Sequence, residues 1–555
     1  MKAILLFVFF VSSYAASAQA SWQWVNQLHS TGGAVSAKSV AADGYGGSFV
    51  TGSFRGTIRF NQFTLTSRGQ SDLFVVRYDA AGRALWAIQL GQDPAVQSYY
   101  QSTASGADIS LDAAGNAYVV GNFTGAVSYQ GGALQGFQDG FNTGLVLKLN
   151  GRGQVQWAQR FGITQFGCYG YAIATDAAGN SYITGQSDYG NIRFGNQVYG
   201  PGSRRVMYVA CYRTTGTVAW AQLSSNFTTY GASGSDIALD GRGNCYVGGF
   251  FNNDMTLAGN SITTVGADSY LASFNATSGS LQWLRQGGGT GTSSANNNTH
   301  ISTLATDRLG NIYTAGDFSG TSSLGGQMLT AVGQSDIFLA RYTPAGTVQW
   351  VKTIGTSAPE YSNTLVTDAA GYTTLVGRRL DASYQPRLLL YGFQPDGFQY
   401  YTNTIGTSGS CLGNRLAQEP GGQLYLASDV SGTASFGSTT VQISTGTDGV
   451  VGKFRVHTPM ASGGSGGQPS FEVFPNPARG RMIARLSWAR PGMPLQGYAT
   501  LSTTMGRVVA SQPLQANSAV QSQSVFDASA LPTGLYVVQF HTADGMNYTQ
   551  TIEVK

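Results

Sequence analysis

The sequence predicts an all-β protein, in which a ring of repeated four-stranded sheets is followed by a small β-sandwich. A turn motif recurs seven times, and the residues around each copy alternate between apolar and polar with the period of a strand. Composition agrees, because the 555 residues include 76 Gly and only 10% charged residues. Gly is thus well above its ordinary share, and charge is less than half of the usual proportion. A hydrophobic content of 42% excludes a mainly disordered chain.

The repeated motif is an acidic residue with Gly three positions later and, in all but one copy, an aromatic residue six positions later. The copies read DGYGGSFVTG from residue 43, DAAGNAYVVG from 112, DAAGNSYITG from 176, DGRGNCYVGG from 240, DRLGNIYTAG from 307, DAAGYTTLVG from 368 and the degenerate EPGGQLYLAS from 419. Asp accepts a hydrogen bond from the backbone two residues on, and Gly adopts the positive φ that a three-residue hairpin loop requires. Each copy therefore predicts a turn between two strands.

Two more strands follow each motif. A third strand, such as LFVVRY from 73, leads through a second Gly-bearing turn to a fourth strand that carries a Trp. These are Trp86, Trp157, Trp220, Trp283 and Trp350. Four antiparallel strands make one blade of a β-propeller. Well-known blades take about 40–45 residues, whereas the copies here recur every 51 to 69 residues, so we expect the additional residues to form loops.

The last copy ends at VVGKFR without a Trp strand, while Trp24–Leu28 repeats the pattern of Trp86–Leu90. We therefore expect the N-terminal strand to complete the last blade and hide both sheet edges. The prediction is a seven-bladed β-propeller over 21–456. Its Asp-x-x-Gly-Asn-x-Tyr core resembles the SBBP-type β-propeller repeats of exported bacterial proteins, over roughly 22–456. The sixth copy departs from that pattern at Tyr372 and Thr374.

Residues 1–20 have the features of a secretory signal peptide. Lys2 precedes an apolar run, and Ala18 and Ala20 form a small-x-small cleavage site. Nine apolar residues are too few to cross about 30 Å of hydrocarbon as a helix, and no later segment predicts a transmembrane helix. Export permits disulfides, but the four cysteines show no CxxC pattern. We expect buried or unpaired thiols, with one bridge such as Cys211–Cys245 as the alternative.

The C-terminal part changes in composition. Residues 457–470 are a Gly/Ser linker, and 471–555 alternate like the strands of a small immunoglobulin-like β-sandwich. Three motifs carry a resemblance: Pro475-Asn476-Pro477, Met505–Val509 with Gly506 and Arg507, and Leu531–Tyr536 with Gly534 and Tyr536. The segment resembles the type A C-terminal sorting domain of cargo of the Bacteroidetes type IX secretion system. A generic sandwich adhesion module is the alternative.

The sorting resemblance implies that the type IX machinery is a partner and that the protein is translocated across the outer membrane. It also implies removal of the domain, followed by release or by attachment to surface lipopolysaccharide. The resulting location is the outer cell surface or the medium, reached through the periplasm.

The long segments of the repeats fall on one face of the predicted ring, where binding usually occurs on a rigid scaffold. Candidate ligand-face residues are Tyr99, Tyr100, Phe166, Tyr169, Phe227, Tyr230 and Tyr361. Aromatic rings among Asn, Gln, Ser and Thr suit a glycan or a protein ligand. The alternative is that the rings only wedge between blades.

The candidate acids for chemistry are Asp108 and Asp236, which we place on innermost strands of the second and fourth blades, facing the channel. They are candidates for an acid or metal site, with solvated channel side chains as the alternative. No catalytic, cofactor or metal motif occurs, and a net charge of +4 does not suit nucleic acid. We expect a non-enzymatic binding protein without a cofactor. The alternatives are a glycan-active or other hydrolytic propeller, and a structural surface component without a ligand.

Overall fold

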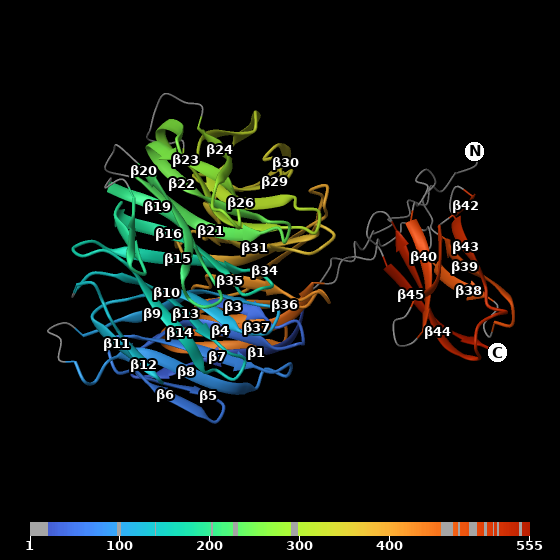
Figure 1. Ribbon diagram of the computed structural model, residues 1–555, viewed down its shortest axis with the longest axis horizontal. Coiled ribbons are helices and arrows are strands. Elements are labelled where there is room, and N and C mark those ends of the chain that lie inside the picture. The colour runs from blue at the N-terminus through green and yellow to red at the C-terminus, as the bar shows by residue number, and fades with distance from the viewer. Residues whose placement is uncertain are drawn as a thin grey trace, which may run out of the picture. The chain divides into compact units, whose positions relative to one another are not determined.

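The computed structural model describes residues 20–96, 101–138, 140–200, 204–225, 231–289, 298–456, 470–474, 478–487, 497–503, 508–513, 515–518, 521–542 and 547–555. Every regular element in these ranges is a β-strand, and no helix there is long and apolar enough to cross a membrane. The strands belong to two compact units, one within Ala18–His457 and one within Thr458–Lys555 (Figure 1).

The larger unit repeats one arrangement of four antiparallel strands, which we call a set. In set 1, β3 (Val35–Ala42), β4 (Ser48–Phe54), β7 (Asp72–Tyr78) and β8 (Ala84–Gln92) pair in that order. The same order recurs in four further sets. Sets 2 and 3 consist of β9 (Ala104–Leu111), β10 (Ala117–Phe123), β13 (Thr143–Leu149) and β14 (Val155–Gly162), and of β15 (Cys168–Thr175), β16 (Ser181–Tyr189), β19 (Arg204–Tyr212) and β20 (Val218–Ser225). Sets 5 and 6 consist of β25 (Thr299–Thr306), β26 (Ile312–Phe318), β29 (Asp336–Tyr342) and β30 (Val348–Ile354), and of β31 (Glu360–Thr367), β32 (Thr373–Leu380), β33 (Pro386–Phe393) and β34 (Gln399–Ile405). Set 4 consists of β21 (Ala232–Leu239), β22 (Asn244–Leu257), β23 (Asn260–Asn275) and β24 (Leu281–Gly289).

Set 7 takes its strands from both ends of the unit. β35 (Arg415–Gln418), β36 (Leu424–Phe436) and β37 (Thr439–Val456) are joined by β1 (Ala20–Leu28), which pairs antiparallel with β37. Trp22 lies opposite Phe454 and stacks on its ring at a centroid distance of 4.5 Å. Trp24 lies opposite Lys453. The strand that the sequence predicted from the Trp24–Leu28 pattern is therefore paired where the repeat requires it.

The additional residues of the repeat are β-hairpins, so the expectation of loops is wrong. The separate hairpins are β5–β6 (Thr57–Phe60, Phe63–Thr66), β11–β12 (Ala126–Tyr129, Gly132–Gln135), β17–β18 (Ile192–Phe194, Gln197–Tyr199) and β27–β28 (Thr321–Leu324, Gln327–Thr330). In sets 4 and 7 the second and third strands themselves extend to form the hairpin. These segments are short alternating strands around tight turns, which is a hairpin pattern.

Each separate hairpin pairs with the preceding set. β11 pairs with β8, β17 with β14 and β27 with β24, while β5 pairs with β2 (Ser30–Thr31), which follows β1. Since an outer strand otherwise leaves its backbone groups unpaired, the hairpin covers part of an exposed edge. Set 6 has only the turn 381–385 at this place, which accounts for the shortest repeat interval.

The hydrogen bonds of the first turn explain the whole motif. The Asp112 carboxylate accepts from the Ala114 N–H at 3.0 Å, as predicted, and from the Asn116 side chain at 2.7 Å. The Tyr118 hydroxyl donates to the same carboxylate at 3.1 Å. The motif copies led by Asp176, Asp240 and Asp307 repeat the contacts from Asn and Tyr. The Asn and Tyr of the motif therefore donate hydrogen bonds to the carboxylate of the turn Asp.

A second contact joins each fourth strand to the next set. The indole N–H of Trp86 donates to the Gly151 carbonyl at 3.0 Å, and that of Trp24 donates to the Ala80 carbonyl at 3.1 Å. The same bond is made by Trp157 to Thr214, Trp220 to Ala276, Trp283 to Pro344 and Trp350 to Pro395. Set 6 has tyrosines in place of the Trp, and Tyr400 packs edge-on against Tyr372.

The cores lie between neighbouring sets. Val75 of set 1 packs with Ile109 and Val119 of set 2 in one buried cluster, and Val451 of set 7 shares another cluster with Val50 of set 1. The innermost strands contact one another in the order β3, β9, β15, β21, β25, β31, β35, and β35 also contacts β3. Most of their labels lie toward the middle of the unit in Figure 1.

The second unit contains two four-stranded sheets. One has the order β38 (Ser470–Phe474), β39 (Arg481–Ser487), β43 (Gln521–Asp527), β42 (Gln515–Ser518), and the other β41 (Val508–Pro513), β40 (Gly497–Thr503), β44 (Gly534–Thr542), β45 (Asn547–Val554). Their shared core includes Met482, Phe526 and Val538, which makes the unit a β-sandwich. Gly534 begins β44, and the buried Tyr536 donates its hydroxyl to the Pro532 carbonyl at 2.9 Å.

Gly153 offers a test of the Trp contact between sets. It has a φ of +81°, and a Cβ built there would lie 2.7 Å from the Trp86 ring. We expect Gly153→Ala to lower the free energy of unfolding by about 1–3 kcal/mol, from backbone strain and displacement of the indole. Gly151→Ala is the control, because its Cβ would meet nothing nearer than 3.4 Å. Equal effects of the two variants in urea denaturation would contradict this account.

Candidate functional site

Each innermost strand has one residue four positions before the acidic residue of the first turn. These residues are Ser39, Asp108, Ala172, Asp236, Thr303, Thr364 and Arg415. Four of them accept a hydrogen bond from the backbone of the next set: Asp108 from Ile173, Asp236 from Leu304, Thr303 from Leu365 and Thr364 from Leu416. This layer, which we call the axial layer, links the innermost strands to one another.

Arg415 joins the two predicted channel acids. Its Nη2 donates to the Asp108 carboxylate at 3.2 Å, and its Nη1 donates to the Asp236 carboxylate at 3.1 Å. Both acids are buried: Asp108 is 2% exposed and Asp236 is 1% exposed. Ser39 donates a further hydrogen bond to Asp108 at 2.6 Å, and Thr303 donates one to Asp236 at 3.0 Å.

Burial and charge act against each other in this group. Burial raises the pKa of Asp108, and the nearby Asp236 raises it further, whereas Arg415 lowers it. Burial lowers the pKa of Arg415, but the two carboxylates outweigh this effect and raise it above the ordinary value. The two predicted acids lie near each other, because Arg415 bonds to both. The expectation of solvated side chains is wrong, because protein donors occupy their oxygens.

A cavity of about 390 Å³ lies on the side of the axial layer that leads to the first turns. Its walls are the two or three residues that follow the axial position in each innermost strand, for example Val40–Ala42, Ile109–Leu111 and Leu304–Thr306. Arg415 is the charged residue of the lining. These walls also include Ser110, Thr175 and Thr306, so the cavity is of mixed polarity. The opposite side of the layer faces away from the first turns.

On that opposite side, six innermost strands carry a β-bulge at the same place. The bulged residues are Lys38, Ala107, Tyr171, Ser235, Ser302 and Asn363. A bulge re-aims a side chain and is frequent beside functional sites. We call these residues, together with the half-buried residues two positions before them such as Tyr169, His300 and Tyr361, the axial mouth.

Sets 4, 5 and 6 place a cluster of aromatic and charged side chains at the axial mouth. The Arg378 guanidinium lies over the Tyr361 ring, 5.0 Å from its centroid, and donates to Asn363 at 3.2 Å. The His300 ring packs on Phe250 at a centroid distance of 4.7 Å. We call Phe250, His300, Asp317, Tyr361 and Arg378 the mouth cluster.

Asp317 has the most perturbed acidity in the mouth cluster. Burial raises its pKa to about 6, even though Arg378 and the hydrogen bond from Ser302 lower it. Its carboxylate lies 4.0 Å from the Nδ1 atom of His300, whose pKa burial lowers. A buried acid with a raised pKa is a frequent feature of functional sites.

The structure describes only part of the predicted ligand face. Tyr169 stacks on Tyr171 at the axial mouth, and Tyr361 belongs to the mouth cluster. Phe166 stacks on Tyr189 at a centroid distance of 4.8 Å, and neither ring contacts the cluster residues described above. The other predicted site residues, which lie outside the described residues, are Tyr99, Tyr100, Phe227, Tyr230, Ala18, Pro475, Asn476, Pro477, Gly506 and Arg507. Ala20 begins β1.

The cysteines are consistent with the first of the two alternatives. All four are buried and free. Within the described ranges, no three His, Cys, Asp or Glu side chains are grouped so as to hold a metal ion.

Sequence reasoning missed Arg415, His300, Asp317 and Arg378. A register comparison between copies contains the signal for three of them. Arg415 occupies the repeat position of Asp108, while Asp317 and Arg378 follow the Gly of the second strand, where the first two copies have Ser53 and Asn122. His300 lies directly opposite Asp317 in the β25–β26 ladder, so its role depends on strand pairing.

Replacing Arg415 tests the axial layer. We expect Arg415→Leu to lower the free energy of unfolding by about 3–5 kcal/mol at pH 7, because it leaves two buried carboxylates without their cation. The deficit shrinks as the pH is lowered toward 5, since the folded variant then binds protons more tightly than the unfolded chain does. Urea denaturation at both pH values measures this. Arg83→Leu, which removes an exposed ion pair, is the control, and an equally small effect of both variants would refute the assignment.

Replacing Asp317 tests its raised pKa. Because the folded pKa of about 6 lies above the ordinary 3.8, the folded state holds the proton more tightly, and wild-type stability falls as the pH rises through 4 to 6. Asp317→Asn does not lose stability in this way, because an Asn side chain does not ionise. Its unfolding free energy relative to wild type is expected to rise by about 1–3 kcal/mol between pH 4 and pH 7.5. A difference that does not change with pH would contradict the assignment.

Comparison with known protein families finds one family model that matches a segment of each compact unit. Residues 156–193 match the family model of a β-propeller repeat, and residues 472–555 match that of a secretion system C-terminal sorting domain. The chain has no match among curated proteins.

Three solved structures are among those similar to this chain. A plexin A4 extracellular region is 8% identical, with coverage of 95% of this chain and 67% of the other and a TM-score of 0.37. A Dyadobacter fermentans protein of unknown function is 8% identical, with coverage of 79% and 99% and a TM-score of 0.37. The rhamnogalacturonan lyase YesX is 11% identical, with coverage of 78% and 91% and a TM-score of 0.25. At these values the likenesses support no inference about function.

The family models and the two units lead to one assignment. The propeller repeat matches strands of sets 2 and 3, and the sorting domain matches the β-sandwich. The chain therefore carries SBBP β-propeller repeats and a type IX C-terminal sorting domain, which marks it as a protein exported by type IX secretion to the cell surface or the medium.

Proposed function

We propose that the protein is a closed seven-bladed β-propeller that binds a ligand at its axial mouth after delivery to the cell surface. In this proposal each set is one blade, and residues 1–20 and 471–555 serve export and sorting. The pairing of β1 with β37 and the contact of β35 with β3 support closure, because they join the first and last sets. The Trp24 bond to Ala80 supports it further, since it repeats the contact made between other neighbouring sets.

The observation that carries the binding proposal is the mouth cluster. Elsewhere the axial positions are occupied by contacts between sets, whereas here half-buried aromatic rings alternate with groups that donate or accept hydrogen bonds. The Tyr361 ring already lies against the Arg378 guanidinium, which holds both side chains in a defined arrangement. Rigid aromatic and charged groups bind with little loss of conformational freedom.

The mouth cluster suits a neutral or weakly charged polymer, with a glycan as the first class of ligand. Tyr361 and Phe250 offer apolar ring surface, while Asn363, Arg378 and Asp317 supply hydrogen-bonding groups at the same mouth. This combination recognises a molecule that has both apolar faces and hydroxyl groups.

A hydrolytic propeller is the second candidate, and a specific observation favours it. Asp317, with a pKa of about 6, lies beside His300, which is a plausible pairing for proton transfer. The predicted acids Asp108 and Asp236 do not serve this alternative, because Arg415 occupies them. Turnover of a glycan or ester that Asp317→Asn abolishes would favour the enzyme over the binding protein.

A ligand screen tests the binding proposal. We expect the mature chain to bind a member of a glycan array, or a component pulled down from the producer's surface. Tyr361→Ala and Arg378→Gln are each expected to weaken that binding at least about tenfold, because each removes a stacking or hydrogen-bonding group. Isothermal titration measures the affinities.

The matched control is Tyr45→Ala, which removes an aromatic ring that is 90% exposed in the first turn of set 1, away from the axial mouth. It should bind as wild type does. A ligand whose affinity is unchanged by both mouth variants would place its site elsewhere and overturn the proposal, as would a blank screen.

A further inference from the structure

A second cavity lies where hairpin β17–β18 pairs with the outer strand β14, at the junction of sets 2 and 3. Its volume is about 430 Å³. Its apolar lining includes Phe137, Ile163 and Val198, and its polar lining includes Asn191, Arg160 and Arg193. The junction is remote in the repeat from the mouth cluster, which comes from sets 4, 5 and 6.

The two arginines of this cavity have no acidic partner among the described residues. Arg160 packs over the Phe137 ring, 4.5 Å from its centroid, and donates through one nitrogen to the carbonyls of Gln135 and Gly136. These contacts fix the guanidinium and leave its other donors available. Arg193 is exposed, and its side chain has no hydrogen bond to a described residue.

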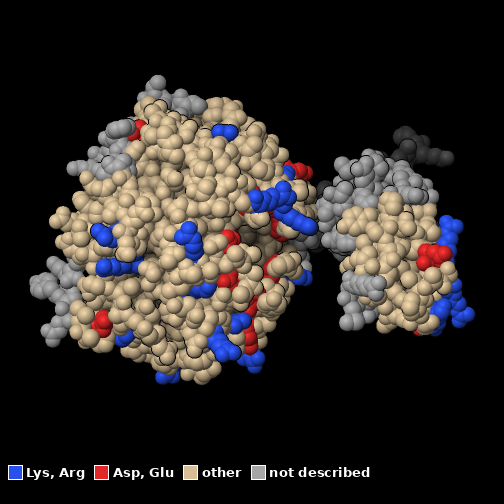
Figure 2. Space-filling model, in the orientation of Figure 1, with Lys and Arg blue, Asp and Glu red and all other residues tan. Residues whose placement is uncertain are grey.

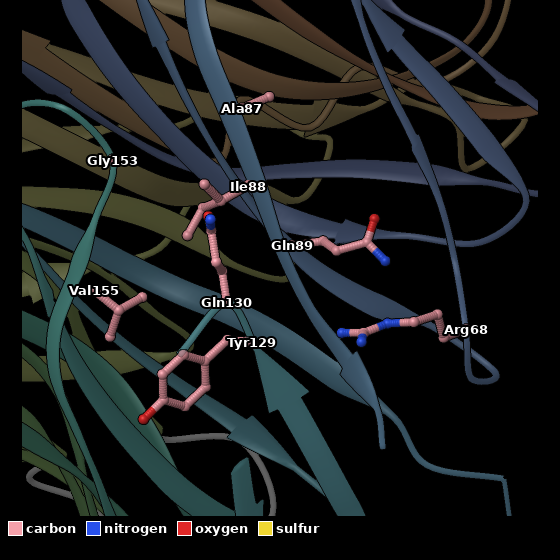
Figure 3. Close-up of a pocket in the computed structure, with 8 residues that line it drawn as sticks. All are labelled: Arg68, Ala87, Ile88, Gln89, Tyr129, Gln130, Gly153 and Val155. Carbon is pink, nitrogen blue, oxygen red and sulfur yellow. The ribbon is translucent and has the colours of Figure 1, made fainter. Parts of the chain in front are cut away.

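The equivalent cavity between sets 1 and 2 shows that the scaffold does not require two arginines without acidic partners. It has about 380 Å³ and is lined by Arg68, Gln89 and Tyr129, among others (Figure 3). Arg68 is occupied there, because it donates to the Ser128 carbonyl at 2.6 Å and its Nε lies 3.8 Å from the carboxylate of Asp72.

The repeat register places Gln89 at the position of Arg160, three residues after the Trp of the fourth strand. The hairpin register places Ser128 at the position of Arg193. The uncharged residues Gln89 and Ser128 at the junction of sets 1 and 2 therefore correspond to Arg160 and Arg193 at the junction of sets 2 and 3. Charged side chains are sparse on the face of this unit that Figure 2 shows, and only 10% of the residues in the chain are charged, so two arginines on one cavity are unusual for this chain.

We propose that this cavity binds an anionic sugar unit, a ring that bears a carboxylate or a sulfate. The two guanidinium groups supply donors for the acid, since Arg pairs with planar oxyanions through parallel hydrogen bonds. Phe137, Ile163 and Val198 contact the apolar face of the ring, and Asn191 serves a hydroxyl group. A sugar suits the cavity better than a bare anion does, because apolar residues form much of the wall and the volume is that of a small-molecule site.

Titration of the full mature chain with defined saccharides tests the proposal. The probes are a tri-galacturonate, its fully methyl-esterified form and a sulfated trisaccharide, with affinity measured by calorimetry. We expect an acidic probe to bind and the ester to bind at least about tenfold more weakly, because the ester keeps the ring but lacks the charge. Arg160→Gln and Arg193→Gln should each weaken the acidic probe at least about tenfold.

Arg152→Gln is the matched control, because it removes the same charge from an exposed turn of set 2 that does not line the cavity. It should bind the acidic probe as wild type does. Unchanged melting temperatures establish that the variants are folded. Equal binding of acid and ester, an acidic probe that binds equally well to both arginine variants, or binding only of a peptide with a free C-terminal carboxylate would each overturn the proposal.

Discussion

The ion network of Arg415 is the constraint on which the arrangement of the innermost strands depends. The Arg415 guanidinium in set 7 bonds to Asp108 of set 2 and to Asp236 of set 4, although Arg415 lies 307 residues after Asp108 in the chain. Removing three charged groups from water is costly, and only well-directed hydrogen bonds compensate for that cost. Small displacements of β9, β21 or β35 would lose those bonds. The network therefore holds three strands from distant parts of the chain in one relative position.

The polar contacts between neighbouring sets are directed mainly at the backbone. The Trp indoles donate to carbonyls of the next set, and residues of the axial layer accept from its N–H groups. Because every residue has a carbonyl, these contacts place few requirements on the side chains of the hairpins and of the axial mouth. The scaffold can thus remain regular while individual sets differ in chemistry. The Asp317–His300 pair of set 5 and the Arg378–Tyr361 pair of set 6 illustrate this difference.

Local chemistry is why the sequence predicted so much of the larger unit. The turn Asp, the positive-φ Gly and the Trp strand each repeat with a fixed spacing, so the four strands of a set and the pairing of Trp24–Leu28 could be inferred. The hairpins were missed because their alternating segments are only three or four residues long and were assigned to loops. Arg415 was missed for a different reason. Its partners lie in other sets, and no local pattern shows that a single Arg on a short strand faces two acids across the axis.

The residues of the candidate sites can be divided into those that recur in most copies of the repeat and those that occur in a single copy. A residue that recurs in most copies, such as the Tyr of the first turn, is explained by a hydrogen bond within the scaffold. A residue that breaks the repeat has no such explanation unless another departure compensates for it. Arg415 is compensated in this way by Asp108 and Asp236. Arg193 has no compensating partner in the described part of the chain, which is the reason for proposing that it serves recognition rather than folding.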